Sequence, residues 1–467
     1  MIDIVKVNQI LKLNITDMTV DGDGIGKTDS GYPLFIKGAV IGDVAMVRIT
    51  KVNKTYGFGK IENLVFSSPK RVEPQCPYFE KCGGCTLMHI DYNEQSKIKE
   101  SHVLSNIKRI GGYEDGSYIY EGMAVNEHIY HYRNKAQFPV GLENGVPVCG
   151  FFEKSSHKIV PTKACLIQNE EINKAVALVM EFFKDNRISI YNEETHRGIV
   201  RHICVRHGGD EKNELMVILV TNCKEKLPKS DELAKLLREN VNLKSLIQNI
   251  NTKNSNVVMG YENITLYGKD SIRAKIKGRE FIISPNSFFQ VNYAQMEKLY
   301  QRAKYYAELT GNETVFDLYC GVGSISLFMA DKAKKVIGIE IVDAAIENAK
   351  KNAALNKADN TEFYCGDCTK ITKELIEKGY KADVVIVDPP RKGCDENLLK
   401  LISDISPKRL VYVSCNSATL ARDLKILKEK YGYVMTKCSL VDMFAHSGHC
   451  EVVAQLHKLS LPDGNDK

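Results

Sequence analysis

Between residues 315 and 456 the sequence repeats one pattern. A short apolar, β-branched run leads directly into a glycine or an acid, and a helical stretch follows. The first such run ends at Gly321 and Gly323, ahead of the helical segment 325–330. Strands that alternate with helices form a parallel sheet covered by helices on both faces. The rhythm therefore predicts a Rossmann-like, doubly wound α/β domain over residues 281–467.

Three further apolar runs in this segment end at an acid, namely Glu340, Asp367 and Asp388. Open parallel sheets bind ligands at the carboxyl ends of their strands, where a glycine turn offers backbone N–H groups and an acid accepts hydrogen bonds from ribose hydroxyls. Together with Gly321 and Gly323, these acids predict a binding site for a nucleoside cofactor.

A cysteine and a glutamate complete the predicted site. Cys415 follows the apolar run 409–414, and Glu451 precedes the run 452–456. Uracil C5 is a poor nucleophile, so its methylation needs a thiolate that adds at C6 and a base that later removes the C5 proton. Either residue alone would fit an ordinary structural role. Together they predict methylation of uracil at C5, with Cys415 as nucleophile and Glu451 as base.

Two other classes of enzyme share part of this pattern. A dinucleotide dehydrogenase needs a third glycine where Ile325 and Ser326 stand, and no neighbouring segment suits a nicotinamide. An amino-group methyltransferase also has an acid before Pro-Pro, but it needs no thiol and usually carries an aromatic residue at the position of Arg391. The pattern therefore favours a uracil methyltransferase with S-adenosylmethionine as the cofactor.

Residues 1–280 follow a different pattern. Residues 1–65 contain short alternating runs, 5–13, 34–36 and 45–52, which are separated by Gly and Asp turns and predict a small β-barrel. Residues 66–280 mix a helix near 93–110 with strands near 202–206 and 215–220, which predicts a central α+β domain.

Cys76, Cys82 and Cys85 lie in a loop rich in Pro and Gly, where thiolates can converge. No fourth ligand is present in the loop. The spacing alone allows either a zinc ion or an iron–sulfur cluster, because each accepts four thiolates. Cys365 and Cys368 form a second pair, but they flank Asp367 at a strand end, and we expect no metal there.

These motifs resemble the RNA uracil-5-methyltransferase family, in particular its 23S ribosomal RNA branch with an N-terminal TRAM domain. The resemblance covers nearly the whole chain. It implies that residues 1–65 form an OB-like, RNA-binding TRAM barrel. It also implies that Ser-Cys-Asn holds the nucleophile Cys415 and that His-Cys-Glu holds the base Glu451. The cofactor residues implied by the family are Gln290, Tyr319, Glu340 and Asp388.

The same resemblance implies a [4Fe–4S] cluster on Cys76, Cys82 and Cys85, with Cys165 as the distant fourth ligand. The spacing differs from the Cys-x3-Cys-x2-Cys pattern of radical S-adenosylmethionine enzymes, so we expect a structural cluster. Ser324 departs from relatives that carry an asparagine there, and we assign no cofactor contact to it. Transfer RNA is the alternative substrate, and a non-catalytic RNA-binding protein with this fold is the second alternative.

Charge and composition restrict the class of protein less than the motifs do. The net charge of +6 permits an anionic partner without requiring one. No apolar run is long enough to span a membrane, and the N-terminal segment carries Asp3, Lys6 and Lys12 instead of a signal-peptide pattern. We expect a cytoplasmic monomer that acts on RNA and not on a membrane, with 131–135 as a further candidate RNA contact.

Overall fold

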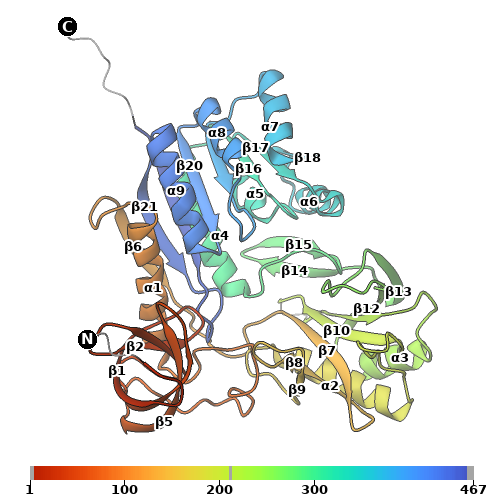
Figure 1. Ribbon diagram of the computed structural model, residues 1–467. Helices are drawn as coiled ribbons and strands as arrows, with labels where there is room; N and C mark the ends of the chain where they lie inside the picture. The colour runs from red at the N-terminus through yellow and green to blue at the C-terminus, as the bar shows by residue number, and fades with distance from the viewer. Residues whose placement is uncertain (1–4, 210–212, 460–467) are drawn as a thin grey trace. The chain divides into compact units, whose positions relative to one another are not determined.

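The structure is a computed structural model that describes residues 5–209 and 213–459. Its contacts divide the chain into two compact units, whose helices and strands are labelled in Figure 1. The first unit contains the residues up to 105 together with 153–156 and 444–450, and the second contains residues 106–152, 157–443 and those from 451 onward. The expected boundaries at residues 65 and 280 stay a prediction.

The first unit contains a closed five-stranded barrel in the strand order β1-β2-β3-β5-β4. Its strands are β1 (Ile10–Met18), β2 (Asp23–Lys27), β3 (Pro33–Lys37), β4 (Val44–Val52) and β5 (Gly57–Phe66). Alternate residues, among them Leu34, Ile36 and Val47, fill its interior. The barrel prediction is confirmed, but β1 starts later than residue 5 because the backbone turns at Asn8, where φ is 69°.

The helix expected near 93–110 is α1 (Tyr92–Arg109). It ends where predicted, because Gly112 adopts a left-handed φ of 68°. Within the described residues, no helix combines the length and apolar character needed to cross a membrane.

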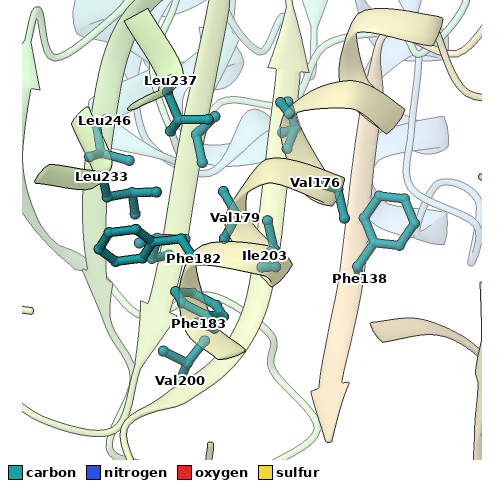
Figure 2. Packing of buried hydrophobic residues seen from close by; sticks show 14 of the residues in the cluster. Phe138, Val176, Val179, Phe182, Phe183, Val200, Ile203, Leu233, Leu237 and Leu246 are labelled. Carbon is teal, nitrogen blue, oxygen red and sulfur yellow. The ribbon is translucent and has the colours of Figure 1, made fainter. Parts of the chain in front are cut away.

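The second unit contains a seven-stranded sheet in the order β13-β12-β11-β10-β7-β8-β9. Helices α2 (Glu170–Asp185) and α3 (Ser230–Asn240) supply apolar side chains of its core, where Phe182 and Phe183 lie near Leu233 and Val200 (Figure 2). The strands are β7 (Lys135–Glu143), β8 (Val146–Phe152), β9 (Ile159–Pro161), β10 (Val200–His207), β11 (Leu215–Thr221), β12 (Leu243–Ile250) and β13 (Glu262–Gly268). The two strands predicted here, 202–206 and 215–220, are β10 and β11.

After a hairpin of β14 (Ile272–Ile276) and β15 (Arg279–Ile283), the chain builds an eight-stranded sheet in the order β18-β17-β16-β19-β20-β22-β21-β6. Its strands are β16 (Thr314–Leu318), β17 (Lys335–Glu340), β18 (Thr361–Cys365), β19 (Val384–Val387), β20 (Arg409–Ser414), β21 (Tyr433–Val441), β22 (Glu451–Lys458) and β6 (Ile119–Ala124). Its helices are α4 (Tyr293–Ala307), α5 (Ser324–Met329), α6 (Asp343–Leu355), α7 (Cys368–Glu377), α8 (Glu396–Ile405) and α9 (Ser417–Tyr431). The five neighbouring strands β18, β17, β16, β19 and β20 are parallel. The chain adds strands on one side of β16 as far as β18 and then continues on the other side of β16 with β19.

This arrangement confirms the Rossmann-like fold. Two strands of the eight-stranded sheet, β21 and β6, were not predicted. Strand β21 pairs with β22, and β6, which precedes the whole central sheet in the sequence, pairs with β21 and so extends the sheet.

Candidate active site

The carboxyl edge of the eight-stranded sheet carries the predicted residues in the order of the strands. Asp367 follows β18, Glu340 ends β17, Tyr319 follows β16, Asp388 follows β19, Cys415 follows β20 and Glu451 begins β22. Neighbouring strands are in matched register, since Leu318 lies beside both Ile339 and Val387. The topology therefore brings together residues that are far apart in the sequence.

The glycine loop turns the chain sharply from β16 into α5. Tyr319, Gly321 and Gly323 all have left-handed φ values, of 67°, 55° and 78°. A Cβ on Gly323 would lie 3.1 Å from side-chain atoms of both Ala349 and Phe363, so space as well as conformation favours glycine there. The left-handed Tyr319 is a strained position for a side chain, of the kind that clusters at functional sites.

Glu340 is already oriented within this loop. Its Oε2 accepts a hydrogen bond from the Gly321 N–H at 3.2 Å, and its Oε1 accepts one from the Val342 N–H at 3.0 Å. Each carboxylate oxygen keeps a further lone pair. The carboxylate can therefore receive ribose hydroxyls without first being ordered.

Two acids near the middle of the edge carry raised pKa values. Burial raises the pKa of Asp317 to about 7, although Ser326 donates its hydroxyl to Asp317 Oδ2 at 2.5 Å. Burial, and then the charge of Asp317, raises the pKa of Asp388 to about 7 as well. A nearby positive charge would favour the ionised form of both acids.

Gln290 lies on the loop between β15 and α4, and Asp367 lies on the turn between β18 and α7. Gln290 is buried, and its carbonyl accepts a hydrogen bond from the Asn134 side chain at 2.9 Å. On the same loop Phe288 is 70% exposed. Asp367 is exposed and caps α7, accepting a hydrogen bond from the Lys370 N–H at 3.0 Å. The cap gives Asp367 a structural role whether or not it contacts a cofactor.

Cys415 and Glu451 lie on adjacent strand ends, because Ser414 is paired with Val452. Glu451 is only 3% exposed. Burial and the nearby charge of Asp388 raise the pKa of Glu451 to about 8, against an opposing effect of Arg391. Burial and the charges of Glu451 and Asp388 raise the pKa of the Cys415 thiol to about 11. The thiol and the carboxyl are thus both electrostatically coupled to Asp388.

Arg391 also belongs to this site, although the sequence alone predicts no role for it. Its charge opposes the raised pKa values of both Cys415 and Glu451. Its carbonyl accepts hydrogen bonds from Asn416 Nδ2 at 3.2 Å and from Thr419 Oγ1 at 3.1 Å. Its position directly after Asp388-Pro-Pro in the sequence could have indicated that Arg391 lies near the site. Only the fold shows that the start of α9 holds this loop in place.

Gly393 allows the loop that carries Arg391 to lie close to α9. Its φ is 78°, and a Cβ there would lie 2.6 Å from both Arg422 Nη2 and Asp423 Oδ2. Asp423 in turn accepts hydrogen bonds from the Cys394 N–H at 2.9 Å and from the Tyr412 hydroxyl at 2.6 Å. The loop that carries Asp388 and Arg391 is therefore fixed to the helix that follows Cys415.

The cysteine loop of the first unit presents three half-buried thiols. The Gly84 N–H donates to Cys82 Sγ at 3.4 Å, and the pKa of Cys82 is raised by burial and, to a smaller extent, by the nearby Cys76. Cys165 belongs to the second unit, where Asn173 holds its backbone through two hydrogen bonds of 2.9 and 3.0 Å. Among the described residues, no three His, Cys, Asp or Glu side chains are gathered closely enough to hold a metal ion, and this includes the loop.

Cys365 ends β18, and Cys368 is the first residue of α7. Cys365 donates its thiol to the Ile341 carbonyl at 3.6 Å, and the buried Cys368 donates to the Ile339 carbonyl at 3.9 Å. The two thiols thus point to different backbone partners.

Comparison with known families gives two matches. The family model described as tRNA (Uracil-5-)-methyltransferase matches residues 117–459, and the TRAM domain model matches residues 5–61. A Clostridium tetani protein described as an uncharacterized RNA methyltransferase is 46% identical over 450 residues, which cover 96% of each chain. A Listeria monocytogenes protein with a similar description is 46% identical over 454 residues, covering 97% of this chain and 99% of that protein.

Among solved structures, the chain is similar to the Pyrococcus abyssi tRNA (uracil-54, C5)-methyltransferase in complex with S-adenosyl-L-homocysteine. The TM-score is 0.74 at 28% sequence identity, and the match covers 96% of this chain and 100% of that one. The similarity thus extends over both the barrel and the sheets.

Proposed function

The chain belongs to the tRNA (uracil-5-)-methyltransferase family, and from this premise we propose that it methylates C5 of a uridine in 23S ribosomal RNA through a covalent bond between Cys415 and C6 of the base. S-adenosylmethionine-dependent methylation of RNA uracil is the activity of the family. The RNA class and the roles of the individual residues are our proposal.

One observation carries the proposed chemistry: Cys415 and Glu451 occupy adjacent strand ends beside Asp388 and Arg391. The Cys415 thiolate adds to C6, and the electron pair of the C5–C6 double bond moves towards O4 to form an enolate. C5 then takes the methyl group that S-adenosylmethionine supplies. Glu451 removes the C5 proton, the double bond reforms and the thiolate leaves.

The electrostatics link this chemistry to cofactor binding. With a pKa of about 11, Cys415 is a thiol at neutral pH while the sulfonium is absent. A positive charge beside Asp388 would lower that pKa and also the pKa of Glu451, about 8, so that Glu451 is ionised when it acts as the base. The thiol should therefore be alkylated faster in the presence of an S-adenosylmethionine analogue that carries a charged amine in place of the sulfonium than with S-adenosylhomocysteine, whose thioether sulfur is uncharged. Equal alkylation rates would contradict a coupling between the charge of the cofactor and the pKa of Cys415.

Ribosomal RNA is proposed because the barrel and the cysteine loop together resemble the ribosomal branch of the family. Transfer RNA is the second candidate, because the solved Pyrococcus abyssi structure is that of a transfer RNA enzyme. The decisive experiment maps 5-methyluridine in 23S and transfer RNA from cells with and without this protein. Loss of the modification from transfer RNA alone would reject the ribosomal assignment, and loss from neither would reject uridine methylation.

We also propose that Cys76, Cys82, Cys85 and Cys165 hold a [4Fe–4S] cluster. Three of these thiols share one loop, and the Gly84 N–H is directed at Cys82 Sγ, which is a contact that stabilises a cluster thiolate. Thiolates are the usual ligands of such clusters. When bound, the cluster would supply a rigid cross-link between chain segments and not redox chemistry on the base.

A further inference from the structure

Three aromatic rings meet on the outer surface of the barrel. Phe35 lies on β3, Phe58 on β5, and Tyr56 on the turn before β5. Their ring centroids are 5.7 to 5.8 Å apart in all three pairs. Phe35 and Phe58 are half-buried, and Tyr56 is 38% exposed. We call this group the aromatic face. Other residues fill the barrel interior, so the core does not account for it.

Local sequence explains why these side chains point outward. Gly57 and Gly59 are buried on the inner side of β5, where a Cβ on Gly59 would lie 2.3 Å from a methyl group of Val47. Because side chains alternate along a strand, Phe58 and Lys60 must then lie on the outside. The sequence Gly-Phe-Gly-Lys thus places an aromatic ring and a cation on the same side of the barrel wall.

The register of β3 and β5 extends this arrangement across the surface. Phe35 is paired with Phe58, and Lys37 is paired with Lys60. Like charges directly opposite each other destabilise a sheet. Among the described residues, neither ammonium forms an ion pair with a carboxylate, whereas the nearby acids Asp23 and Glu62 pair with Lys154 and Arg48. The barrel therefore keeps two cations without ion-pair partners beside its aromatic face.

Phe35, Phe58, Lys37 and Lys60 line a cavity of about 1090 Å³ that lies wholly within the first unit. The cysteine loop supplies another part of its wall, which includes Phe79, Cys82, Cys85 and His89. The ring centroids of Phe79 and His89 are 5.3 Å apart. Burial lowers the pKa of His89 to about 4, so this buried ring adds no charge to the cavity wall at physiological pH.

We propose that this cavity binds two or three unpaired nucleotides of the substrate RNA, with bases stacked on Phe35 and Phe58 of the aromatic face and phosphates beside Lys37 and Lys60. The inference rests on the proposed function for the identity of the ligand as RNA. Ring faces stack on bases of any sequence, and closely spaced cations neutralise phosphates. A duplex hides its base faces, so the site selects a single strand.

The absence of tryptophan from the chain allows a direct test. Phe58→Trp places a unique fluorophore on the aromatic face of the full-length protein. Phe66→Trp is the matched control, because Phe66 lies on the same strand, is 56% exposed and does not line the cavity. Titration with a single-stranded 12-mer of adenosine should quench the first variant saturably and leave the second unchanged. Equal quenching of both variants, or of neither, would overturn the proposal.

Affinity measurements provide a second, independent readout. Phe35→Ala with Phe58→Ala should weaken binding of the 12-mer at least tenfold, while Phe66→Ala should change it less than twofold. Lys37→Ala with Lys60→Ala should reduce the slope of log K against log salt by about 1.4, since each phosphate contact on a single strand contributes about 0.7. Unchanged affinity and slope would overturn the proposal.

The choice of oligonucleotide separates this inference from the proposed function, because oligoadenosine contains no uridine to methylate. If it binds through the aromatic face but no RNA acquires 5-methyluridine, the proposed function fails and the inference stands. If uridine is methylated and the 12-mer binds equally well to the ring variants, only the inference fails. Thermal unfolding of the lysine variant should be unchanged or occur at a higher temperature, since the paired cations oppose folding.

Discussion

The carboxyl edge of the eight-stranded sheet and the cysteine loop differ in how far the fold alone assembles a site. At the edge, residues from six strands converge, because five parallel strands end there and the antiparallel strand β22 begins there. In the loop, Cys76, Cys82 and Cys85 are close in sequence, yet the described residues form no metal site. Convergence at the edge follows from the topology, whereas in the loop the proposed cluster would have to gather the thiols. Closeness in sequence is thus a weaker guide than position in a sheet.

The largest expected effect tests whether the edge is catalytic. Cys415→Ala should abolish methyl transfer and should form no covalent adduct with RNA that carries 5-fluorouridine at the target, because the bond to C6 requires the Cys415 sulfur. Wild-type protein should give a shifted band on a denaturing gel. Cys365→Ala, which removes an exposed thiol at the end of β18, is the control and should keep both properties. Methyl transfer by Cys415→Ala would identify another nucleophile.

Glu451→Gln should slow turnover by about 10² to 10⁴, the usual contribution of a general base, and should accumulate the methylated adduct. Time courses of product and adduct measure both effects. A variant that turns over as fast as wild type would exclude Glu451 as the base.

The same variant should change the pH dependence of stability. The folded pKa of Glu451, about 8, lies above the ordinary value of about 4.3. Between these values the unfolded chain is ionised while the folded protein keeps its proton, so the contribution of Glu451 to stability falls as pH rises. Glutamine avoids this loss. Between pH values of about 4.3 and 8, the free energy of unfolding of the variant should rise relative to that of wild type, by up to about 1.4 kcal/mol per pH unit. Denaturant unfolding at several pH values measures this difference.

Gly393→Ala tests whether the edge needs the fixed loop. The new Cβ would meet Arg422 and Asp423, so Arg391 should shift and turnover should fall about tenfold or more, with about 1 to 3 kcal/mol lost in stability. Gly379→Ala is the matched control, because Gly379 has a φ of 89° but a Cβ there would meet no heavy atom within 4 Å. Chemical denaturation and single-turnover rates should separate the two. Equal effects of the two substitutions would show that backbone strain, and not the contact with Arg422 and Asp423, causes the loss.

Glu340→Ala should weaken cofactor binding about tenfold, because a hydrogen bond to a charged group contributes about 1.5 kcal/mol or more. RNA affinity should stay the same. Calorimetry with S-adenosylhomocysteine measures the first and a filter-binding assay the second. Glu347→Ala, on the exposed face of α6, is the control. Unchanged cofactor affinity in Glu340→Ala would remove this residue from the site.

The smallest effect on chemistry is expected for the cysteine loop. Cys82→Ala should lose iron and acid-labile sulfide from anaerobically purified protein, and with them solubility or RNA affinity. Its single-turnover rate on bound RNA should stay within about threefold of wild type. Cys223→Ala, outside the predicted ligand set, should keep its iron. Stoichiometric zinc without iron in wild-type protein would reject the cluster.

Much of the edge could be predicted from sequence because each strand is a short buried run with a polar residue at its end, as in Val384–Val387 before Asp388. Strand β6 was missed because it has no such run: all six of its residues are at least partly exposed. The role of Arg391 was missed for a different reason. It depends on hydrogen bonds from Asn416 and Thr419, which lie beyond the next helix and strand in the sequence.

The pairing of β6 with β21 limits how this protein can be dissected. A fragment that starts at residue 281 would lose β6 and leave the long strand β21 at an open sheet edge. It would also lose Asn126, which donates to the Asp442 carbonyl at 2.5 Å and accepts from Asn292 at 2.7 Å. Such a fragment should aggregate through that edge. An expression fragment meant to isolate the methyltransferase sheet must therefore retain residues 117–126 as a tethered strand.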